Sequence, residues 1–267
     1  MTIPDHTKPP VVLIPGMWST GETLSEVKQA FEAQGYEVDS LCLPEHKAKL
    51  EYDQAAKNRL ARTSLQDYVD FIVAKVKDHA VAPILVGHSM GGLLAQLVAA
   101  RVPISKLVLL SSAAPGGING WSWSVIRTFG RNLLIFPLWR KVTEVGESNV
   151  KYGIANSQTA SVQAQIMESM TYESGMATFQ IGVGGFFNSG FSRVDAKQVA
   201  CPILIIGGLA DRITPIKVQR AIAKKYGEQA NLVELPAVCH WTIGGSNLPQ
   251  VMSVIFNWLD DQMNIAA

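Results

Sequence analysis

Ser89 is the residue whose surroundings most clearly indicate chemistry. It lies in the stretch "GHSMG" of residues 87–91, after the apolar run 83–86 and before residues 92–102, which have helical periodicity. A Gly-x-Ser-x-Gly pattern between strand and helix is typical of a nucleophile elbow, with the serine at the tip of a strained turn. Side chains at the two flanking positions would collide with neighbouring backbone, so glycine is needed there. We therefore predict that Ser89 is a nucleophile; the alternative is a glycine-rich turn in which Ser89 only caps the helix.

His240 is the best candidate for the base that a serine nucleophile requires. A serine hydroxyl is weakly nucleophilic near neutral pH, so it needs a base to take its proton and a carboxylate to orient that base. His240 follows the last predicted strand, in "LPAVCHWTIGG", at the sheet edge where Ser89 is expected. The other histidines are predicted to lie elsewhere: His6 in a polar tail, His46 in a charged loop, His79 at the end of a surface helix, and His88 beside the serine but pointing away from it.

Asp211 is the best candidate for the carboxylate. It comes directly after an apolar strand in "ILIIGGLADRITP", whereas the competing position after "KLVLLSSAAPGG" offers no acid. The chain order Ser89, Asp211, His240 is the order found in strand-turn-helix serine hydrolases. The alternative role for Asp211 is that of a loop or capping residue.

Two backbone amides are expected to stabilise a negatively charged oxygen beside the serine. One is the N–H of Met90, directly after Ser89, and the other is the N–H of Met17 in the loop "IPGMW". Gly16 would let that loop approach closely. We predict that Gly16, Trp18 and His88 contact the substrate; for Met17 and Trp18 a position in the core is the alternative.

The elements that would position these residues follow from alternating strand and helix patterns. Six runs are predicted as strands: 11–16, 36–44, 83–87, 106–112, 202–208 and 231–236. Four of them are almost entirely apolar, as expected of parallel strands covered on both faces. The alternation predicts an α/β fold with a mostly parallel, doubly wound sheet of about six strands.

Capping patterns in the sequence indicate the ends of two helices. Ser64 and Asp67 have the spacing of a capping box before a helical apolar stripe. Thr214 and Pro215 read as an N-cap and first helical residue, and Gly227 as the end of that helix.

Residues 115–195 interrupt the alternation, because a simple crossover between strands needs far fewer residues. We predict a hydrolase-like core over 1–114 and 196–267, with 115–195 inserted as a mostly helical cap; the alternative is an ordinary crossover with extra core helices. The insertion is rich in aromatic residues: Trp121, Trp123, Phe129, Phe136, Trp139, Phe179, Phe186, Phe187 and Phe191. It therefore predicts an apolar lid over the serine.

The composition of the chain limits which binding partners and cofactors can be expected. With 23 basic and 22 acidic residues, the chain has no long-range field to attract nucleic acid or anionic lipid. The cysteines Cys42, Cys201 and Cys239 form no disulfide framework or metal-binding spacing, so buried thiols are expected, and neither a metal nor another cofactor is predicted. The N-terminal residues lack the apolar region of a secretory signal, and no stretch is predicted to insert stably in a membrane. A cytoplasmic protein is expected.

These motifs together resemble the α/β-hydrolase superfamily, in particular its capped esterases, lactonases and lipases. The segments "VVLIPGMW", "VGHSMGG", "PILIIGGLADRITP" and "CHW" occur in that family's order. One departure is Pro15, where many relatives have a histidine. The resemblance implies a cofactor-free hydrolase acting on a small apolar ester through Ser89, Asp211 and His240. Thioester, lactone or carbon–carbon bond hydrolysis on the same residues stays open, as does a ligand-binding receptor of the same fold; oligomeric state is not predicted.

Overall fold

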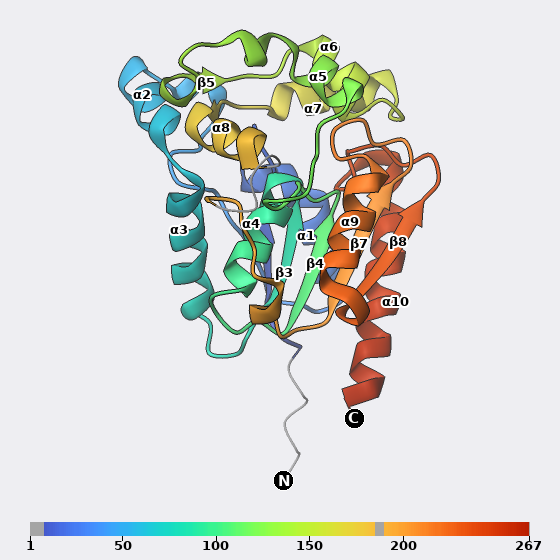
Figure 1. The fold of residues 1–267 in the computed structure, drawn as a ribbon. Coiled ribbons are helices and arrows are strands. Elements are labelled where there is room, and N and C mark those ends of the chain that lie inside the picture. Colours follow the sequence, from blue (N-terminus) through green and yellow to red (C-terminus); the bar gives the residue numbers. More distant parts are fainter. Residues whose placement is uncertain (1–7, 185–189, 267) are drawn as a thin grey trace.

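A six-stranded sheet forms the centre of the computed structural model, which describes residues 8–184 and 190–266 (Figure 1). The strand order is β2-β1-β3-β4-β7-β8, and every neighbouring pair is parallel. The strands are β1 (Val11–Ile14), β2 (Val38–Ser40), β3 (Ile84–His88), β4 (Lys106–Leu110), β7 (Ile203–Gly208) and β8 (Ala230–Leu235). The predicted α/β fold class and all six predicted strands are confirmed.

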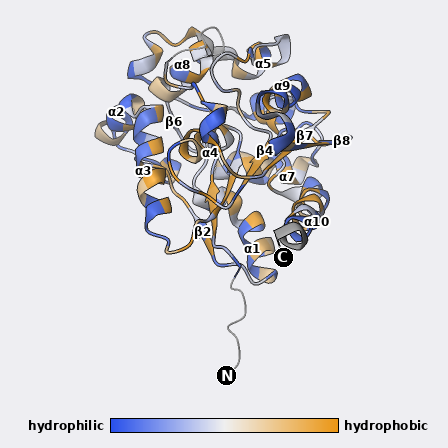
Figure 2. Cartoon of the chain, turned by 60° about the horizontal axis from the view of Figure 1, so that its bottom comes forward, coloured by the Kyte–Doolittle hydropathy of each residue, from blue (hydrophilic) through white to orange (hydrophobic). Residues whose placement is uncertain are grey.

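Helices cover both faces of this sheet. On one face lie α1 (Ser25–Ala33) and α10 (Leu248–Ala266), and on the other α3 (Leu65–Lys77), α4 (Met90–Ala99) and α9 (Ile216–Tyr226). Successive side chains of a strand point to opposite faces, so β1 contributes Val11 and Leu13 to one apolar cluster and Val12 and Ile14 to the other. Figure 2 shows the resulting pattern, with apolar strands between helices of mixed hydropathy. The apolar strand runs of the sequence therefore lie in a core with two layers.

The helix ends differ from expectation at one residue. In α3 the predicted capping box is present, with the Asp67 amide donating to Ser64 Oγ (3.2 Å) and the Ser64 amide donating to Asp67 Oδ2 (2.7 Å). Gly227 ends α9 with φ 62°, also as predicted. The N-cap of α9 is Pro215 rather than Thr214, so that prediction was wrong. Thr214 instead directs its hydroxyl to other buried acceptors, described below.

An upper layer lies over the carboxyl ends of the strands (Figure 1). It contains most of residues 115–195, here called the cap segment. Its elements are α5 (Trp123–Phe129), α6 (Glu147–Asn149), α7 (Ala160–Ser169), α8 (Gly175–Gly184) and an antiparallel pair, β5 (Val142–Thr143) with β6 (Glu173–Ser174). Helix α2 (Gln54–Arg62) joins this layer from outside the cap segment and packs on α8 and β6. The division of the chain into a core and an inserted cap domain stays a prediction.

Two expectations from composition can be checked against the structure: that the cysteines are buried, and that no segment inserts stably in a membrane. Cys201 and Cys239 are buried as expected, but Cys42 is exposed, so the expectation was wrong there. Cys42 lies between the buried Leu41 and Leu43, and alternation therefore turns its side chain outward. Across the described part of the chain, every helix is too short or too polar to serve as a bilayer span.

Candidate active site

Ser89 occupies the tip of a tight turn between β3 and α4. Its backbone angles are φ 54° and ψ −117°, a conformation that costs about 1–3 kcal/mol for a residue with a side chain. A Cβ at Gly87 would collide with the carbonyl group of Gly91, and a Cβ at Gly91 with the carbonyl group of Ile14. The two glycines of the motif are thus required by close backbone contacts, as the sequence predicted. The Ser89 side chain faces a cavity.

The Asp211 carboxylate and the His240 ring form a buried pair. His240 Nδ1 lies 2.9 Å from Asp211 Oδ2, and both side chains are almost fully buried. The backbone amides of Ile213 and Thr214 donate to Asp211 Oδ1 at 2.8 and 2.9 Å. Because a carboxylate only accepts hydrogen bonds, the Nδ1 atom carries the proton and Nε2 is left with a lone pair. His240 lines the same cavity as Ser89 and has no hydrogen bond at Nε2 from any described residue.

The surroundings of Asp211 keep it ionised. Burial would raise the pKa of this carboxyl, but the His240 ring and the donated hydrogen bonds lower it, and the net direction is down. Thr214 adds a further contact, because its Oγ1 lies 2.9 Å from Asp211 Oδ2, 2.9 Å from the Ser111 carbonyl oxygen and 3.2 Å from His240 Nδ1. This threonine was read from sequence only as a helix cap, and it instead tethers the carboxylate–histidine pair to the end of β4.

The loop after β1 approaches Ser89 closely. A Cβ at Gly16 would lie 3.0 Å from His88 Nδ1 and 3.1 Å from Ser89 Cβ, so a larger residue here would press on both side chains and glycine favours the close approach. Met17 and Met90 both line the cavity beside Ser89. Neither of their backbone amides donates to an acceptor within the described residues. Both amides are therefore available to a ligand, as an oxyanion-binding role requires.

His88 lines the cavity but is occupied by a backbone contact. Its Nε2 donates to the carbonyl oxygen of His240 at 3.0 Å, which supports the loop that carries the candidate base. Burial, followed by the nearby His240 ring, lowers the pKa of His88 to about 3. His88 is consequently a neutral hydrogen-bond donor at ordinary pH. Its contact with a substrate stays a prediction, as does that of Gly16 and Trp18, the latter buried beside the cavity.

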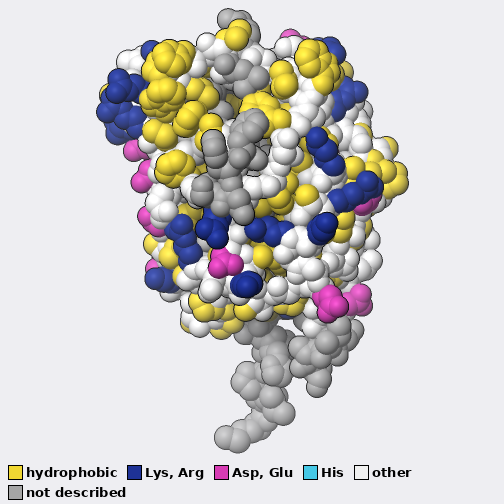
Figure 3. All heavy atoms as spheres, viewed as in Figure 1, with side chains coloured by type: hydrophobic (Ala, Val, Ile, Leu, Met, Phe, Trp, Pro, Cys, Tyr) yellow, Lys and Arg dark blue, Asp and Glu magenta, His cyan; other side chains and the backbone are white. Residues whose placement is uncertain are grey.

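The cavity next to Ser89 has a volume of about 250 Å³ and a mostly apolar wall. Three of the aromatic residues of the cap segment line it: Trp121, Phe129 and Phe179. Three others are exposed on the outside (Trp123, Phe136 and Phe191), while Phe186 and Phe187 lie outside the described residues. Figure 3 shows hydrophobic side chains gathered at the upper end of the molecule. Among the described lining residues there is no Asp, Glu, Lys or Arg.

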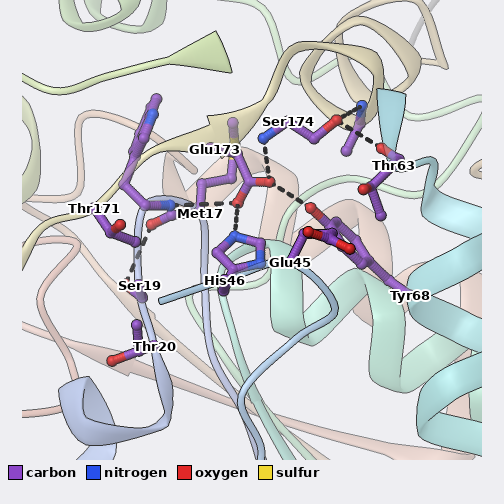
Figure 4. Close-up of polar contacts among 12 residues, drawn as sticks. Met17, Ser19, Thr20, Glu45, His46, Thr63, Tyr68, Thr171, Glu173 and Ser174 are labelled. Atoms are coloured by element: carbon purple, nitrogen blue, oxygen red, sulfur yellow. Dashed lines mark hydrogen bonds and ion pairs between the residues drawn. The ribbon is translucent and has the colours of Figure 1, made fainter. Parts of the chain in front are cut away.

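A second buried carboxylate–histidine pair lies behind the Met17 loop. His46, expected in a charged loop, lies in the loop after β2 but is buried there, and its Nε2 lies 3.1 Å from Glu173 Oε2 (Figure 4). Its charged neighbours did not indicate this burial, which arises because the residues after β2 fold beneath the cap segment. The two partners are 127 positions apart and belong to no motif, so no local signal in the sequence would have paired them.

Comparison with known proteins agrees with this fold. Residues 11–250 match the alpha/beta hydrolase family, and the chain therefore belongs to that family. A search of curated proteins finds no matching sequence.

Solved structures of similar fold cover nearly the whole chain. A methylesterase from Arabidopsis has a TM-score of 0.69 at 13% identity, covering 95% of this chain and 99% of that one. A pyrethroid hydrolase from Sphingobium faniae JZ-2 has a TM-score of 0.67 at 18% identity, with 92% and 96% covered. Polyneuridine aldehyde esterase has a TM-score of 0.66 at 14% identity, with 96% and 99% covered. At these identities the likeness establishes the fold.

Proposed function

We propose that this protein is a cofactor-free serine hydrolase that cleaves a carboxylic ester with an apolar acyl or ring portion. The observation that carries the proposal is the Asp211–His240 pair beside the cavity that Ser89 also lines. His240 Nδ1 lies 2.9 Å from Asp211 Oδ2, and Nε2 has no hydrogen-bond partner among the described residues. That arrangement suits a base that accepts a proton from a serine hydroxyl. The fold neighbours described as an esterase, a methylesterase and a pyrethroid hydrolase support hydrolytic chemistry.

The reaction proceeds through an acyl-enzyme. Ser89 Oγ attacks the ester carbonyl carbon while His240 Nε2 takes the hydroxyl proton, and Asp211 stabilises the imidazolium that forms. The carbonyl oxygen becomes negatively charged and binds the amides of Met17 and Met90, each worth about 10²–10³ in rate. The bond to the alcohol oxygen breaks and His240 returns the proton to it. Water then attacks the acyl carbon, with His240 again as base. The bond between the acyl carbon and Ser89 Oγ breaks, His240 returns the proton to Oγ, and the carboxylic acid leaves.

The cavity wall supports an uncharged, apolar substrate. A wall with no acidic or basic side chain among its described residues offers no partner to a charged acyl group or amine, whose desolvation would be uncompensated. A wider role as a thioesterase, lactonase or carbon–carbon bond hydrolase would use the same residues, and a ligand-binding receptor would use the same cavity.

Replacement of Ser89 by alanine tests the proposal directly. The variant is expected to lose about three to six powers of ten in kcat, because the nucleophile is removed, while keeping the fold. The measurement is turnover of a panel of nitrophenyl esters, thioesters and lactones by wild type and S89A, with circular dichroism as the control for folding. Retention of more than about a tenth of wild-type activity would exclude Ser89 as the nucleophile. Release of product in a single stoichiometric step by wild type would favour a receptor.

A homologous series of nitrophenyl esters tests the apolar cavity. Each added methylene is expected to raise kcat/KM by up to about fourfold, the equivalent of about 0.8 kcal/mol of buried surface, until the cavity is full. A series that is flat or falls from acetate onward would contradict an apolar acyl site.

A further inference from the structure

Glu173 is a fully buried carboxylate that links the cap segment to the loop after β1. Its Oε2 accepts from His46 Nε2 (3.1 Å) and from the backbone amide of Trp18 (3.4 Å). Its Oε1 accepts from the Tyr68 hydroxyl (2.8 Å) and the Ser174 amide (2.6 Å). Figure 4 shows Glu173 surrounded by Met17, His46, Tyr68 and Ser174. Three segments far apart in the chain thus meet at one side chain, next to the candidate oxyanion loop.

The contacts around Glu173 require two acceptor atoms. Each carboxylate oxygen faces one backbone N–H, and a backbone N–H can only donate. On the other side of the pair, His46 Nδ1 lies 3.3 Å from the carbonyl oxygen of Pro44, which can only accept. A protonated imidazole facing an ionised carboxylate satisfies all of these groups at once. Burial lowers the pKa of His46, but the charge and hydrogen bond of Glu173, together with the backbone contacts at Pro44 and Leu43, raise it, and the net direction is up, in agreement with this assignment.

The peptide group between Met17 and Trp18 is held at both ends. Its N–H donates to Glu173, and its carbonyl oxygen, on Met17, accepts from Ser19 Oγ at 3.2 Å. Trp18 has φ 58°, in the left-handed region that residues with side chains rarely adopt, and such a conformation persists only where its surroundings fix it. On the preceding side, Gly16 is packed against His88 and Ser89. The Met17 amide, between these two fixed points, has little freedom to turn away from the cavity.

We propose that Glu173 is a positioning residue for the oxyanion loop: by holding the Trp18 amide, it keeps the adjacent Met17 amide directed at the oxygen that becomes charged when Ser89 attacks. This inference rests on the function proposed above. It assigns to the cap segment a part in catalysis that is separate from enclosing the substrate. Glu173 touches neither substrate nor reacting atoms, and it acts through the peptide of residues 17 and 18.

The variant E173Q isolates this role, because an amide fits the space but cannot accept at both positions. Whichever way the glutamine side chain is turned, its NH₂ group faces a backbone N–H, of Trp18 or of Ser174. We expect kcat to fall by about 10- to 100-fold, less than the 10²–10³ expected when an oxyanion donor is removed outright. KM should stay within about threefold, because the ground-state carbonyl depends little on this donor. Inhibition by phenylboronic acid, whose tetrahedral serine adduct places an oxygen at the same position, should weaken in parallel with kcat.

Ser174→Ala serves as the matched control. Ser174 is the next residue on β6 and is equally buried, and its hydroxyl donates to the Thr63 carbonyl oxygen at 2.6 Å without touching the Met17 loop. S174A should lower the melting temperature yet keep kcat within about twofold of wild type, because the hydrogen bonds lost, with Ala61, Thr63 and Ala177, are structural. Kinetics are measured below both melting temperatures. If E173Q fails to fold, Glu173→Asp takes its place, because it keeps two carboxylate acceptors but draws them back from the Trp18 amide by one methylene, and it should lower kcat several-fold.

The outcomes separate the two proposals. Wild-type turnover that depends on Ser89 is established first, and its absence would overturn the proposed function and with it this inference. Where that turnover exists, a selective loss of kcat and of phenylboronate affinity in E173Q or E173D supports the positioning role. Unchanged kcat in the folded variants, or a rise in KM alone, overturns the positioning role and leaves the hydrolase intact. Equal kcat losses in E173Q and S174A would also overturn it, because the effect would then be structural.

Discussion

Two buried carboxylate–histidine pairs lie on either side of the Met17 loop, and they are made of the same groups at similar distances. The Asp211–His240 contact is 2.9 Å long and the Glu173–His46 contact 3.1 Å. In the first pair the carboxylate binds Nδ1, and Nε2 has no partner among the described residues. In the second the carboxylate binds Nε2, while Nδ1 faces the Pro44 carbonyl oxygen. The comparison teaches that the unoccupied nitrogen, rather than the pair itself, makes a histidine available as a base.

His88 extends the comparison to a buried histidine with no carboxylate. Burial and the neighbouring His240 ring lower its pKa to about 3, whereas for His46 the contacts with Glu173 and with the Pro44 and Leu43 backbone together outweigh burial and raise the pKa. Neutral His88 donates to a carbonyl oxygen, and charged His46 forms an ion pair. The carboxylate partner thus decides which protonation state the fold retains.

The largest expected effect comes from Asp211→Asn. The substitution keeps the size of the side chain but removes the charge that orients His240 and stabilises its imidazolium, which costs about 10⁴ in kcat in a comparable triad. KM should change little. Steady-state kinetics of D211N and E173Q on the best ester test whether the Asp211–His240 pair contributes more to kcat than the Glu173–His46 pair. Near-normal kcat in D211N would mean that another carboxylate orients the base, and the two pairs would then not differ in function.

An intermediate effect is expected on acid stability from His88→Gln. The folded pKa of His88, about 3, lies below its ordinary value of 6.5, so between these values the unfolded chain binds a proton that the folded chain does not. The free energy of unfolding therefore falls as the pH drops, by about 1.4 kcal/mol per pH unit, or about 2 kcal/mol from pH 6.5 to 5. Urea unfolding at these two pH values should show wild type losing that much more stability than H88Q. Equal losses in the two proteins would mean that His88 gains a proton in the folded state.

The smallest effect, with the opposite sign, is expected for His46→Gln. The folded pKa of His46 is raised, so its stabilising contribution is complete below the ordinary value of 6.5 and is lost as the pH rises through the folded pKa. The difference in unfolding free energy between wild type and H46Q should therefore shrink from pH 6 to pH 9. A difference that grows with pH would contradict an ion pair at this position.

The predictable features of the site were those that depend on short stretches of sequence or on the order of the strands. Gly87 and Gly91 indicated the elbow because their spacing around Ser89 is a recognised motif, although the contact that requires Gly91 is with Ile14 on β1. Asp211 and His240 were placed together because each follows a predicted strand, and these strands, β7 and β8, are neighbours in the sheet. Such information is local, or follows from the rule that parallel strands end at one edge.

The Glu173 cluster was not predictable for the converse reason. Its strand β6 has only two residues, too few to show alternation, and its partners lie in a loop, in α3 and after β1. Thr214 was assigned to a cap because its sequence context fits one, whereas tertiary contacts with Ser111 and His240 determine where its hydroxyl points. Contacts of this kind depend on how distant segments pack, which no spacing along the chain records.

The contacts of Trp18 have a consequence for attempts to redesign this protein by exchanging its segments. The backbone N–H, the indole Nε1 and the carbonyl oxygen of Trp18 form hydrogen bonds with Glu173, Thr143 and Thr171, all of which belong to the cap segment. A chimera that grafts a foreign cap onto residues 1–114 and 196–267 would remove all three partners of a residue adjoining the oxyanion loop. Residue 18 would then have to be redesigned together with the graft. In this chain, therefore, exchanging the cap segment to change the substrate range would also be expected to change the catalytic rate.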